Sequence, residues 1–523
     1  MESACLTESC VDTRRPERLP IFEEDPVATR EDVDVVIVGG GPAGAVLANR
    51  LSDDPGRRVL LIEAGPDYGS DRAGWPAELL FSEQQALRSH SWGLHDAGSG
   101  IDLPRARVIG GSSAVNACYW VRGSAVDFDE WRDLGNPGWG FDDLLPYFRR
   151  AETDPLGGPL HGTDGPVTVW RVQDWSAGDL AVMEAAVALG LEKVDDINGA
   201  RGQVPSTGPA PKNLFGHDRL NSAFSYLRPV RHRPNLRVMA ETTVDRVRFE
   251  GTRAAGVVTS TGARIDADLV VLAAGAYFTP GILNRSGYGD SSELVRLGIP
   301  VTQHLPGVGK NLLDHPFAIG VITGRIRPEA VFGTRLQGQA MVRSRSQGSV
   351  EIDCHIYDAQ YIDEEIGDWV ISLSVSMVNA RSTGTVSLTS TDPTATPRIE
   401  HRHFSDPADL ERMCDGVEFA TELFRTAPLA DLSETLDART WVNGDREALR
   451  GLVRSTTATT NHCSGTAKMG PDTDPSAVVD PDGRVYGAEG LVIADSSIFP
   501  TCPRGNIHFP VVAVAEKIAA GLA

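Results

Sequence analysis

The sequence predicts an α/β fold (α+β overall), in which a domain built on a parallel sheet is interleaved with a second domain built on an antiparallel sheet. Three observations lead to this prediction. A β-branched run at 34–38 is followed by closely spaced glycines and a helical segment. Apolar runs of the same buried type return much later, at 269–275 and 490–495. Between about 340 and 400, by contrast, apolar and polar residues alternate, as in an antiparallel sheet with one covered face.

The composition is that of an ordinary folded protein. Of the 523 residues, 41% are hydrophobic and 23% are charged, which excludes extensive disorder. At roughly 150 residues per domain, this length predicts about three domains. The formal charge of −22 opposes binding to nucleic acid or to an anionic membrane. Because no run approaches the roughly 20 apolar residues of a membrane helix, we expect no membrane span. The composition leaves the oligomeric state open.

The seven cysteines are scattered, with no CxxC pair and no Cys/His cluster at zinc spacing. We therefore expect no metal site and a reduced, cytoplasmic protein. The N-terminus lacks the basic start and apolar core of a secretory signal peptide. Residues 1–32 are polar and contain proline, which predicts an irregular N-terminal arm.

The first regular elements have the pattern of one βαβ unit. Strands at 34–38 and 58–63 flank a helical segment at 45–51. Three glycines with GxGxxG spacing, Gly39, Gly41 and Gly44, lie between the first strand and the helix. In this position the backbone N–H groups and the helix dipole can bind a pyrophosphate.

An acidic residue completes the dinucleotide-binding pattern. Glu63 ends the second strand, at the distance where a carboxylate binds the ribose hydroxyls of a dinucleotide. A carboxylate in this place repels a 2′-phosphate, which argues against NADP. The glycines and Glu63 do not by themselves distinguish NAD from FAD.

The later runs indicate that the first domain is discontinuous. If 269–275 and 490–495 join the parallel sheet, the segments between them are insertions. Alternating runs at 350–356 and 385–389 predict strands of the antiparallel sheet within the inserted part.

Two helices are expected in the C-terminal third. The first is predicted over 406–427, with Ser405 or Asp406 as its N-cap. The second, over 510–523, is an amphipathic closing helix.

Several longer motifs resemble those of the glucose–methanol–choline (GMC) oxidoreductases. Residues 107–116 are similar to the first signature of that family, and 275–289 to the second, apart from Tyr288 in a usually aliphatic position. Further matches lie at 129–139, 305–315, 461–470 and 516–517. Because the matches follow the family's order from about 33 to 520, the chain is identified as a member.

The resemblance implies FAD as the cofactor and a two-domain fold similar to that of p-hydroxybenzoate hydroxylase. The Rossmann-like FAD-binding domain would comprise 33–165, 235–315 and 455–523, and the substrate-binding domain 166–234 and 316–454. Two interleaved domains thus replace the three that length alone predicts.

The resemblance also implies the FAD contacts. Gly110, Gly111 and Ser112 would form a second small-residue loop that approaches the cofactor closely. The other contacts expected are Asn116 near the flavin, Val244 at the adenine, Ala274, Asp495, Phe509 and Pro510. Asp495 follows a strand, and a helix N-cap is an alternative role that is compatible with FAD binding. Some members carry a histidine bonded to the flavin where this chain has Val115, so we expect non-covalent FAD.

The family's C-terminal motif places a catalytic base and a second His or Asn at His462 and His508. On residue type alone, either histidine would be interpreted as structural. Oxidation of an alcohol removes a hydroxyl proton and a carbinol hydride, and the ordinary histidine pKa of about 6.5 suits a base for that proton. We predict His462 as the base and His508 as the partner that holds the alcohol oxygen; shared or exchanged roles stay open. For Cys463, a packing role is favoured.

The sequence predicts FAD-dependent oxidation of a primary alcohol, for example a benzylic or furanic one, to the aldehyde, with hydride transfer to flavin N5. Oxygen or another electron acceptor would reoxidise the flavin. The alternatives are a hydroxynitrile lyase with redox-silent FAD, a light-dependent fatty-acid decarboxylase, and a mycofactocin-type dehydrogenase acting on a cofactor alcohol. Tyr119 and Trp120 form either an aromatic wall of the site or part of the core, and His355 is a weaker candidate for facing the substrate.

Overall fold

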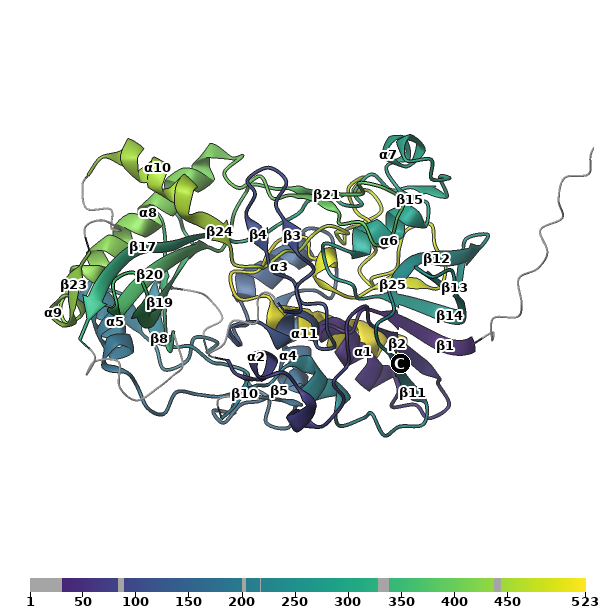
Figure 1. Ribbon diagram of the computed structural model, residues 1–523, viewed down its shortest axis with the longest axis horizontal. Helices are drawn as coiled ribbons and strands as arrows, with labels where there is room; N and C mark the ends of the chain where they lie inside the picture. The colour runs from purple at the N-terminus through teal and green to yellow at the C-terminus, as the bar shows by residue number, and fades with distance from the viewer. Residues whose placement is uncertain (1–30, 83–88, 200–203, 217, 328–337, 437–443) are drawn as a thin grey trace, which may run out of the picture.

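The computed structural model describes residues 31–82, 89–199, 204–216, 218–327, 338–436 and 444–523. Of the predicted N-terminal arm, residues 1–30 lie outside the described residues, and 31–32 already belong to the first strand. Figure 1 shows the two main sheets at opposite ends of the molecule, with the C-terminal segment, drawn in yellow, running between them.

The parallel sheet joins distant parts of the chain. Its order is β11 (Leu236–Met239), β2 (Val59–Ile62), β1 (Glu31–Val38), β14 (Arg264–Leu272), β13 (Arg253–Thr259) and β12 (Val244–Glu250), and β25 (Leu491–Ile493) also pairs with β14. The contacts of β1 with β2 and β14, and of β14 with β25, are parallel. The prediction that the four apolar runs form one parallel sheet is confirmed. The sheet also contains β11 and an antiparallel extension, β12 and β13, which the sequence analysis did not identify.

Helix α1 (Pro42–Leu51) and helix α11 (His508–Leu522) pack against each other beside this sheet. A buried carboxylate joins them, because Glu516 accepts hydrogen bonds from Arg50 Nε at 2.8 Å and Arg50 Nη2 at 2.7 Å. Tyr226 donates its hydroxyl to the same carboxylate at 2.9 Å. The closing helix is thereby fixed to the helix that begins at the GxGxxG turn.

The antiparallel sheet forms the other end of the molecule. Its order is β23 (Ser433–Thr435), β17 (Pro316–Ile326), β20 (Asp368–Met377), β19 (Cys354–Asp363), β18 (Ala340–Ser344), β8 (Ser206–Pro209) and β7 (Glu192–Lys193), and β24 (Thr457–Thr459) also pairs with β17. Helices α5 (Ala177–Ala188), α8 (Pro407–Phe424) and α10 (Arg446–Thr456) pack on it. Asp406 is the N-cap of α8 and accepts a hydrogen bond from Ala408 N.

The alternation along β19 gives the two faces of this sheet different roles. Ile356 joins the apolar cluster beneath the helices, whereas Tyr357 lines a cavity on the opposite face. The run at 385–389 behaves differently from the prediction, because β21 (Thr385–Ser387) pairs only with β22 (Arg398–Glu400) in a separate small sheet. The hairpin is bonded to the loop that contains Gly309, because Val386 N donates a hydrogen bond to Gly309 O at 2.7 Å. Alternation predicts a strand but does not determine its partner.

No helix among the described residues is long and apolar enough to cross a bilayer. The five cysteines in the described part of the chain are free thiols.

A buried ion-pair network joins segments that precede and follow β6 (Val167–Thr168). His161 lies between three carboxylates, with its Nδ1 3.1 Å from Glu152 Oε1 and its Nε2 2.8 Å from Asp196 Oδ2. Glu152 also accepts a hydrogen bond from Trp120 Nε1 at 3.0 Å. Burial opposes the charge on His161, but the bonds to Asp154, Asp196 and Glu152 outweigh it and raise the pKa of this imidazole to about 10.

This raised pKa predicts a specific pH dependence of stability. Because His161 takes up its proton more strongly in the folded state, its contribution is complete below about pH 6.5 and is lost as the pH rises towards 10. The free energy of unfolding of the wild type, measured by denaturant titration, should therefore decline more steeply between pH 6.5 and 9.5 than that of His161→Gln. The difference should be on the order of 3 kcal/mol. Equal pH slopes would show that His161 is not charged in the folded protein.

Candidate functional site

A cavity of about 1020 Å³ is lined by residues from both halves of the molecule. One end is formed by the carboxyl ends of β1 and β2, through Val38 and Ile62. The other end is formed by the antiparallel sheet, through Phe317, Tyr357 and Ser374. The cavity therefore lies where open α/β sheets bind ligands, and the second sheet closes it.

Two glycine-containing loops meet at the first end of the cavity. Gly110 N donates to Gly40 O at 2.8 Å, so the loops are in direct backbone contact. A Cβ on Gly111 would lie 2.7 Å from Gly41 Cα, and Gly111 also has a φ of +53°. Only glycine allows this approach, which leaves Gly39, Gly41, Gly111 and Ser112 lining the cavity.

Helix α1 starts at this contact with free amide groups. Its N-cap is Gly41, which makes no side-chain cap, and the first turn contains no acidic residue. The amide groups and the positive end of the helix dipole are thus available to an anionic group in the cavity.

Glu63 lies beside the same turn. Its carboxylate accepts hydrogen bonds from Gly40 N and Gly65 N, each at 2.8 Å. Burial raises the pKa of Glu63, and the two amide bonds oppose that rise. Glu63 lines the cavity at the end of β2, so its predicted role in binding ribose hydroxyls stays a prediction.

The ends of two other segments of the parallel sheet complete this side of the cavity. Ala274 follows β14 and Val244 begins β12, and both line the cavity. Asp495 follows β25 and accepts hydrogen bonds from Gly275 N at 2.8 Å and Thr279 Oγ1 at 2.7 Å. It also caps a short helix through Ser497 N at 2.8 Å, so the N-cap role is present in a residue that lines the cavity.

Four predicted FAD contacts lie one layer behind the cavity wall. Gly44 packs against the preceding turn, where a Cβ would lie 1.8 Å from Gly39 O. Gly110 occupies a left-handed turn with a φ of +91°. Phe509 is buried and stacks on Trp120 with 4.2 Å between ring centroids, and Pro510 is buried beside it. These residues shape the wall and do not line the cavity.

His462 and His508 lie 46 residues apart in the sequence, and both line the cavity. His508 Nδ1 lies 3.3 Å from the Asn116 side-chain nitrogen, and Trp120 packs edge-on against the His508 ring at 5.1 Å. His462 Nδ1 lies 2.9 Å from His315 Nδ1, and His462 Nε2 lies 3.5 Å from Asn506 Nδ2. The two predicted histidines are therefore brought to one site.

His315 and Asn506 were not predicted as site residues. Both lie inside motifs that the sequence analysis singled out, at 305–315 and next to His508, but only contact with His462 gives them a role. Of the two roles considered for these aromatic residues, Tyr119 forms part of the cavity wall and Trp120 is buried in the core. His355 is buried, with its Nδ1 3.3 Å from the Tyr357 hydroxyl, and it is not among the cavity-lining residues.

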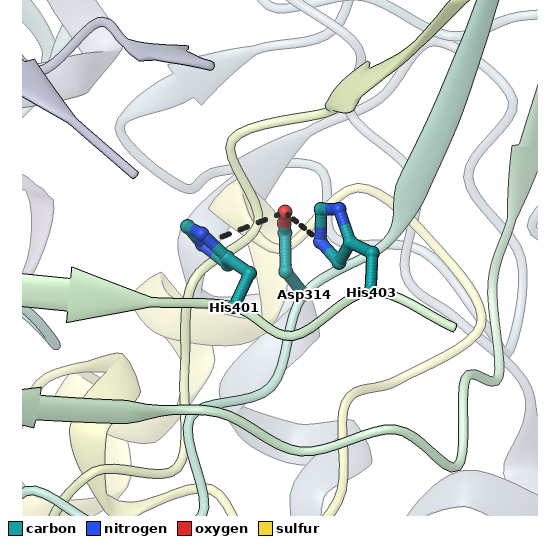
Figure 2. Close-up of side chains that lie close together, drawn as sticks. All are labelled: Asp314, His401 and His403. Atoms are coloured by element: carbon teal, nitrogen blue, oxygen red, sulfur yellow. Dashed lines mark ion pairs between the residues drawn. The ribbon is translucent and has the colours of Figure 1, made fainter. Parts of the chain in front are cut away.

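A cluster of two histidines and one carboxylate lies behind His462. Figure 2 shows His401 and His403 on either side of Asp314. Asp314 Oδ2 lies 3.7 Å from His401 Nε2 and 3.4 Å from His403 Nε2. Three such groups within 4.8 Å of one another are spaced as metal ligands can be.

The Asp314 cluster already has hydrogen-bond partners that account for its geometry. Asp314 accepts the backbone N–H of His462 at 2.8 Å and the hydroxyl of Thr459. His401 lies between Asp96 Oδ2 at 3.1 Å and the Tyr277 hydroxyl at 2.9 Å. We therefore interpret the cluster as a hydrogen-bonded support of the site.

The residues of the cavity fit FAD. The paired glycine loops and the uncapped start of α1 suit a pyrophosphate, Glu63 suits a ribose, and the histidine end suits a flavin next to a substrate. Val115 lines the cavity with an alkyl side chain that cannot form a covalent bond to the flavin.

Comparison with known proteins agrees with this geometry. Family models described as GMC oxidoreductase match residues 33–317 and 380–515. The chain belongs to the GMC oxidoreductase family. It is accordingly an FAD-dependent oxidoreductase with the α/β fold of that family.

Relatives cover nearly the whole chain. Mitochondrial choline dehydrogenase of Homo sapiens is 35% identical over 94% of this chain and 90% of its own length. The 5-(hydroxymethyl)furfural oxidase of Methylovorus sp. (strain MP688) is 36% identical over 93% of this chain and 98% of its own. The crystal structure of pyridoxine 4-oxidase from Mesorbium loti matches with a TM-score of 0.85 and 30% identity, over 94% of this chain and 99% of that one.

The close contact behind the GxGxxG turn predicts a strong effect of one methyl group. Gly44→Ala would place a Cβ against Gly39 O, so the turn must open and the FAD site with it. We expect the variant to lose most of its bound FAD and about 3 kcal/mol or more of stability. The ratio of flavin to protein absorbance and a denaturant titration measure both effects.

Gly451→Ala is the matched control, because Gly451 lies within α10 and a Cβ there meets nothing within 4 Å. It should retain FAD and be slightly stabilised, since alanine favours helix. Full FAD content in Gly44→Ala would contradict the role assigned to the turn.

Proposed function

We propose that this GMC oxidoreductase oxidises a primary aromatic alcohol, benzylic or furanic, to the aldehyde, with His462 as base and His508 as hydrogen-bond donor. The observation that carries the proposal is the set of hydrogen-bond neighbours of the two facing histidines, which favours opposite tautomers of two neutral rings. Bound FAD supplies the acceptor for the carbinol hydride.

The state of His508 follows from Asn116. The Asn116 side-chain oxygen accepts Cys118 N at 3.1 Å, which leaves the amide NH₂ to donate to His508 Nδ1 at 3.3 Å. A neutral His508 therefore carries its proton on Nε2. That atom has no hydrogen-bond partner among the described residues. It is the donor for the alcohol oxygen, and it stabilises the negative charge that develops there.

His462 has the complementary state. We assign the Asn506 NH₂, 3.5 Å from His462 Nε2, as the donor to that atom, so that Nε2 carries a lone pair and Nδ1 carries the proton donated to His315 Nδ1. Burial, followed by the neighbouring His315, lowers the pKa of His462 well below 6.5, and burial lowers the pKa of His508 to about 4. Both rings are neutral near pH 7, so His462 can accept the hydroxyl proton while His508 donates.

The substrate side of the cavity supports an aromatic alcohol. Phe317, Tyr119 and Tyr357 line it, with 5.2 Å between the Tyr119 and Tyr357 centroids and 6.1 Å between those of Phe317 and Tyr357. Rings at such distances pack edge-to-face on a further ring. The similarity to the hydroxymethylfurfural and pyridoxine oxidases is consistent with this class, and reoxidation by O₂ or by another acceptor is part of the proposal.

The proposal predicts that His462→Gln still binds FAD. Its flavin should be reduced by the alcohol at least 100-fold more slowly than the wild-type flavin, because the base is lost. Stopped-flow absorbance under anaerobic conditions measures the rate with benzyl alcohol and 5-(hydroxymethyl)furfural. Paired assays of peroxide and of dye reduction then identify the acceptor. Cyanide release from a cyanohydrin, with no alcohol bleaching the wild-type flavin, would favour a lyase instead.

The lowered histidine pKa values predict the pH profile of the wild type. Because both rings stay neutral down to pH values below 6.5, the limiting rate of flavin reduction should be constant from pH 6.5 to 8.5 and fall only in more acidic buffers. A rate that still rises tenfold between pH 6.5 and 7.5 would contradict a base with a lowered pKa.

A further inference from the structure

The loop that carries His462 contains a left-handed turn. Strand β24 ends at Thr459, and Ser464 pairs again with Leu313. Between these points Asn461 has a φ of +65°, in the left-handed region that residues with a Cβ rarely adopt, although asparagine tolerates it better than the others. A residue held in this region needs contacts that oppose its relaxation, and such residues concentrate at functional sites.

Those contacts converge on one carboxylate. Asp314 Oδ1 accepts His462 N–H at 2.8 Å, and Asp314 Oδ2 accepts the Thr459 hydroxyl. The Thr459 hydroxyl oxygen in turn accepts Asn461 N–H at 2.7 Å. From the opposite side, Arg105 donates to Asn461 O at 2.6 Å. Hydrogen bonds therefore hold the backbone N–H and C=O of Asn461 and the backbone N–H of His462.

The carboxylate itself is held in place. It is 5% exposed, and burial alone would raise its pKa, but His403, His401 and Thr459 outweigh this and keep the pKa of Asp314 below its ordinary value. His401 is fixed in turn, because Asp96 Oδ2 accepts its backbone N–H at 2.7 Å and lies 3.1 Å from its Nδ1. The support therefore extends from His462 to the loop that contains Asp96.

We propose that Asp314, braced by His401 and His403, is a positioning residue that holds the Asn461 turn and so aims His462 Nε2 into the cavity. This inference rests on the proposed function of His462 as the base. Asp314 contacts neither substrate nor flavin in this account, and it acts through the backbone of residue 462.

The test replaces the charge and keeps the shape. In Asp314→Asn the amide oxygen can still accept His462 N–H, but the NH₂ cannot accept the Thr459 hydroxyl and no charge faces the two imidazoles. We expect FAD to remain bound, the limiting rate of flavin reduction to fall at least 30-fold, and the dissociation constant of the alcohol to change less than threefold. Hydrogen exchange, followed by mass spectrometry on the holoenzyme, should accelerate in peptides covering 457–466.

A second pair of variants separates positioning from folding. Thr459→Val removes the hydroxyl and should lower the limiting rate about tenfold, whereas Thr459→Ser keeps it and should restore the rate to within threefold. This pair decides the question if Asp314→Asn does not fold.

The matched control is Asp409→Asn. Asp409 is a fully buried carboxylate that accepts Arg381 N at 2.9 Å and Ser382 N at 2.7 Å, and it does not line the cavity. Its replacement should lower the thermal midpoint and leave the reduction rate within twofold of the wild type.

The outcomes are distinguishable. Wild-type reduction and exchange rates in Asp314→Asn with FAD bound, or equal rates in the two Thr459 variants, would overturn the positioning role while leaving the base in place. An unimpaired His462→Gln would overturn the proposed function, and the positioning role with it.

Discussion

The architecture depends on one close contact between backbones, where the loops 39–44 and 110–112 meet. Gly110 N donates a hydrogen bond to Gly40 O at 2.8 Å, which joins the two loops. A Cβ on Gly111 would lie only 2.7 Å from Gly41 Cα, so position 111 admits no larger residue. Because these loops are far apart in sequence, the chain must leave the parallel sheet and return to its edge. The contact joins the start of α1 and the 110–112 loop into one wall of the cavity.

Several paired charged groups lie behind the cavity wall, whereas the two facing histidines are held in their uncharged form. Glu516, Asp314 and the His161 network are buried with partners of opposite charge or with amide donors. The facing histidines instead have lowered pKa values. This division is physically favourable, since paired charges tolerate burial, and an uncharged imidazole is the form that can accept a proton. The acidic net charge is a separate property, and it still names no substrate.

The sequence is informative where a local pattern has one structural solution. The strand at 34–38, its glycines and Glu63 define a βαβ unit, and all four apolar runs enter the same sheet. It is uninformative where the outcome depends on a distant partner. Nothing local to 385–389 shows that this strand pairs with β22 and not with the large sheet. Asparagine at 461 is compatible with a left-handed turn, but the residue type alone does not show that the turn forms. The motif at 305–315 could mark His315 as a candidate site residue. Its role becomes clear only from the structure, where its Nδ1 lies 2.9 Å from His462 Nδ1.

The short strand β24 has an evolutionary consequence. It pairs with β17 of the antiparallel sheet, and Phe317, which lines the substrate side of the cavity, lies opposite Ala458, only four residues before His462. Substitutions that reshape the substrate side of β17 therefore also move the strand that leads to the base. In such an enzyme selectivity and turnover are not independent traits, and adaptation to a new alcohol is expected to need paired changes, one in β17 and one in the loop after β24.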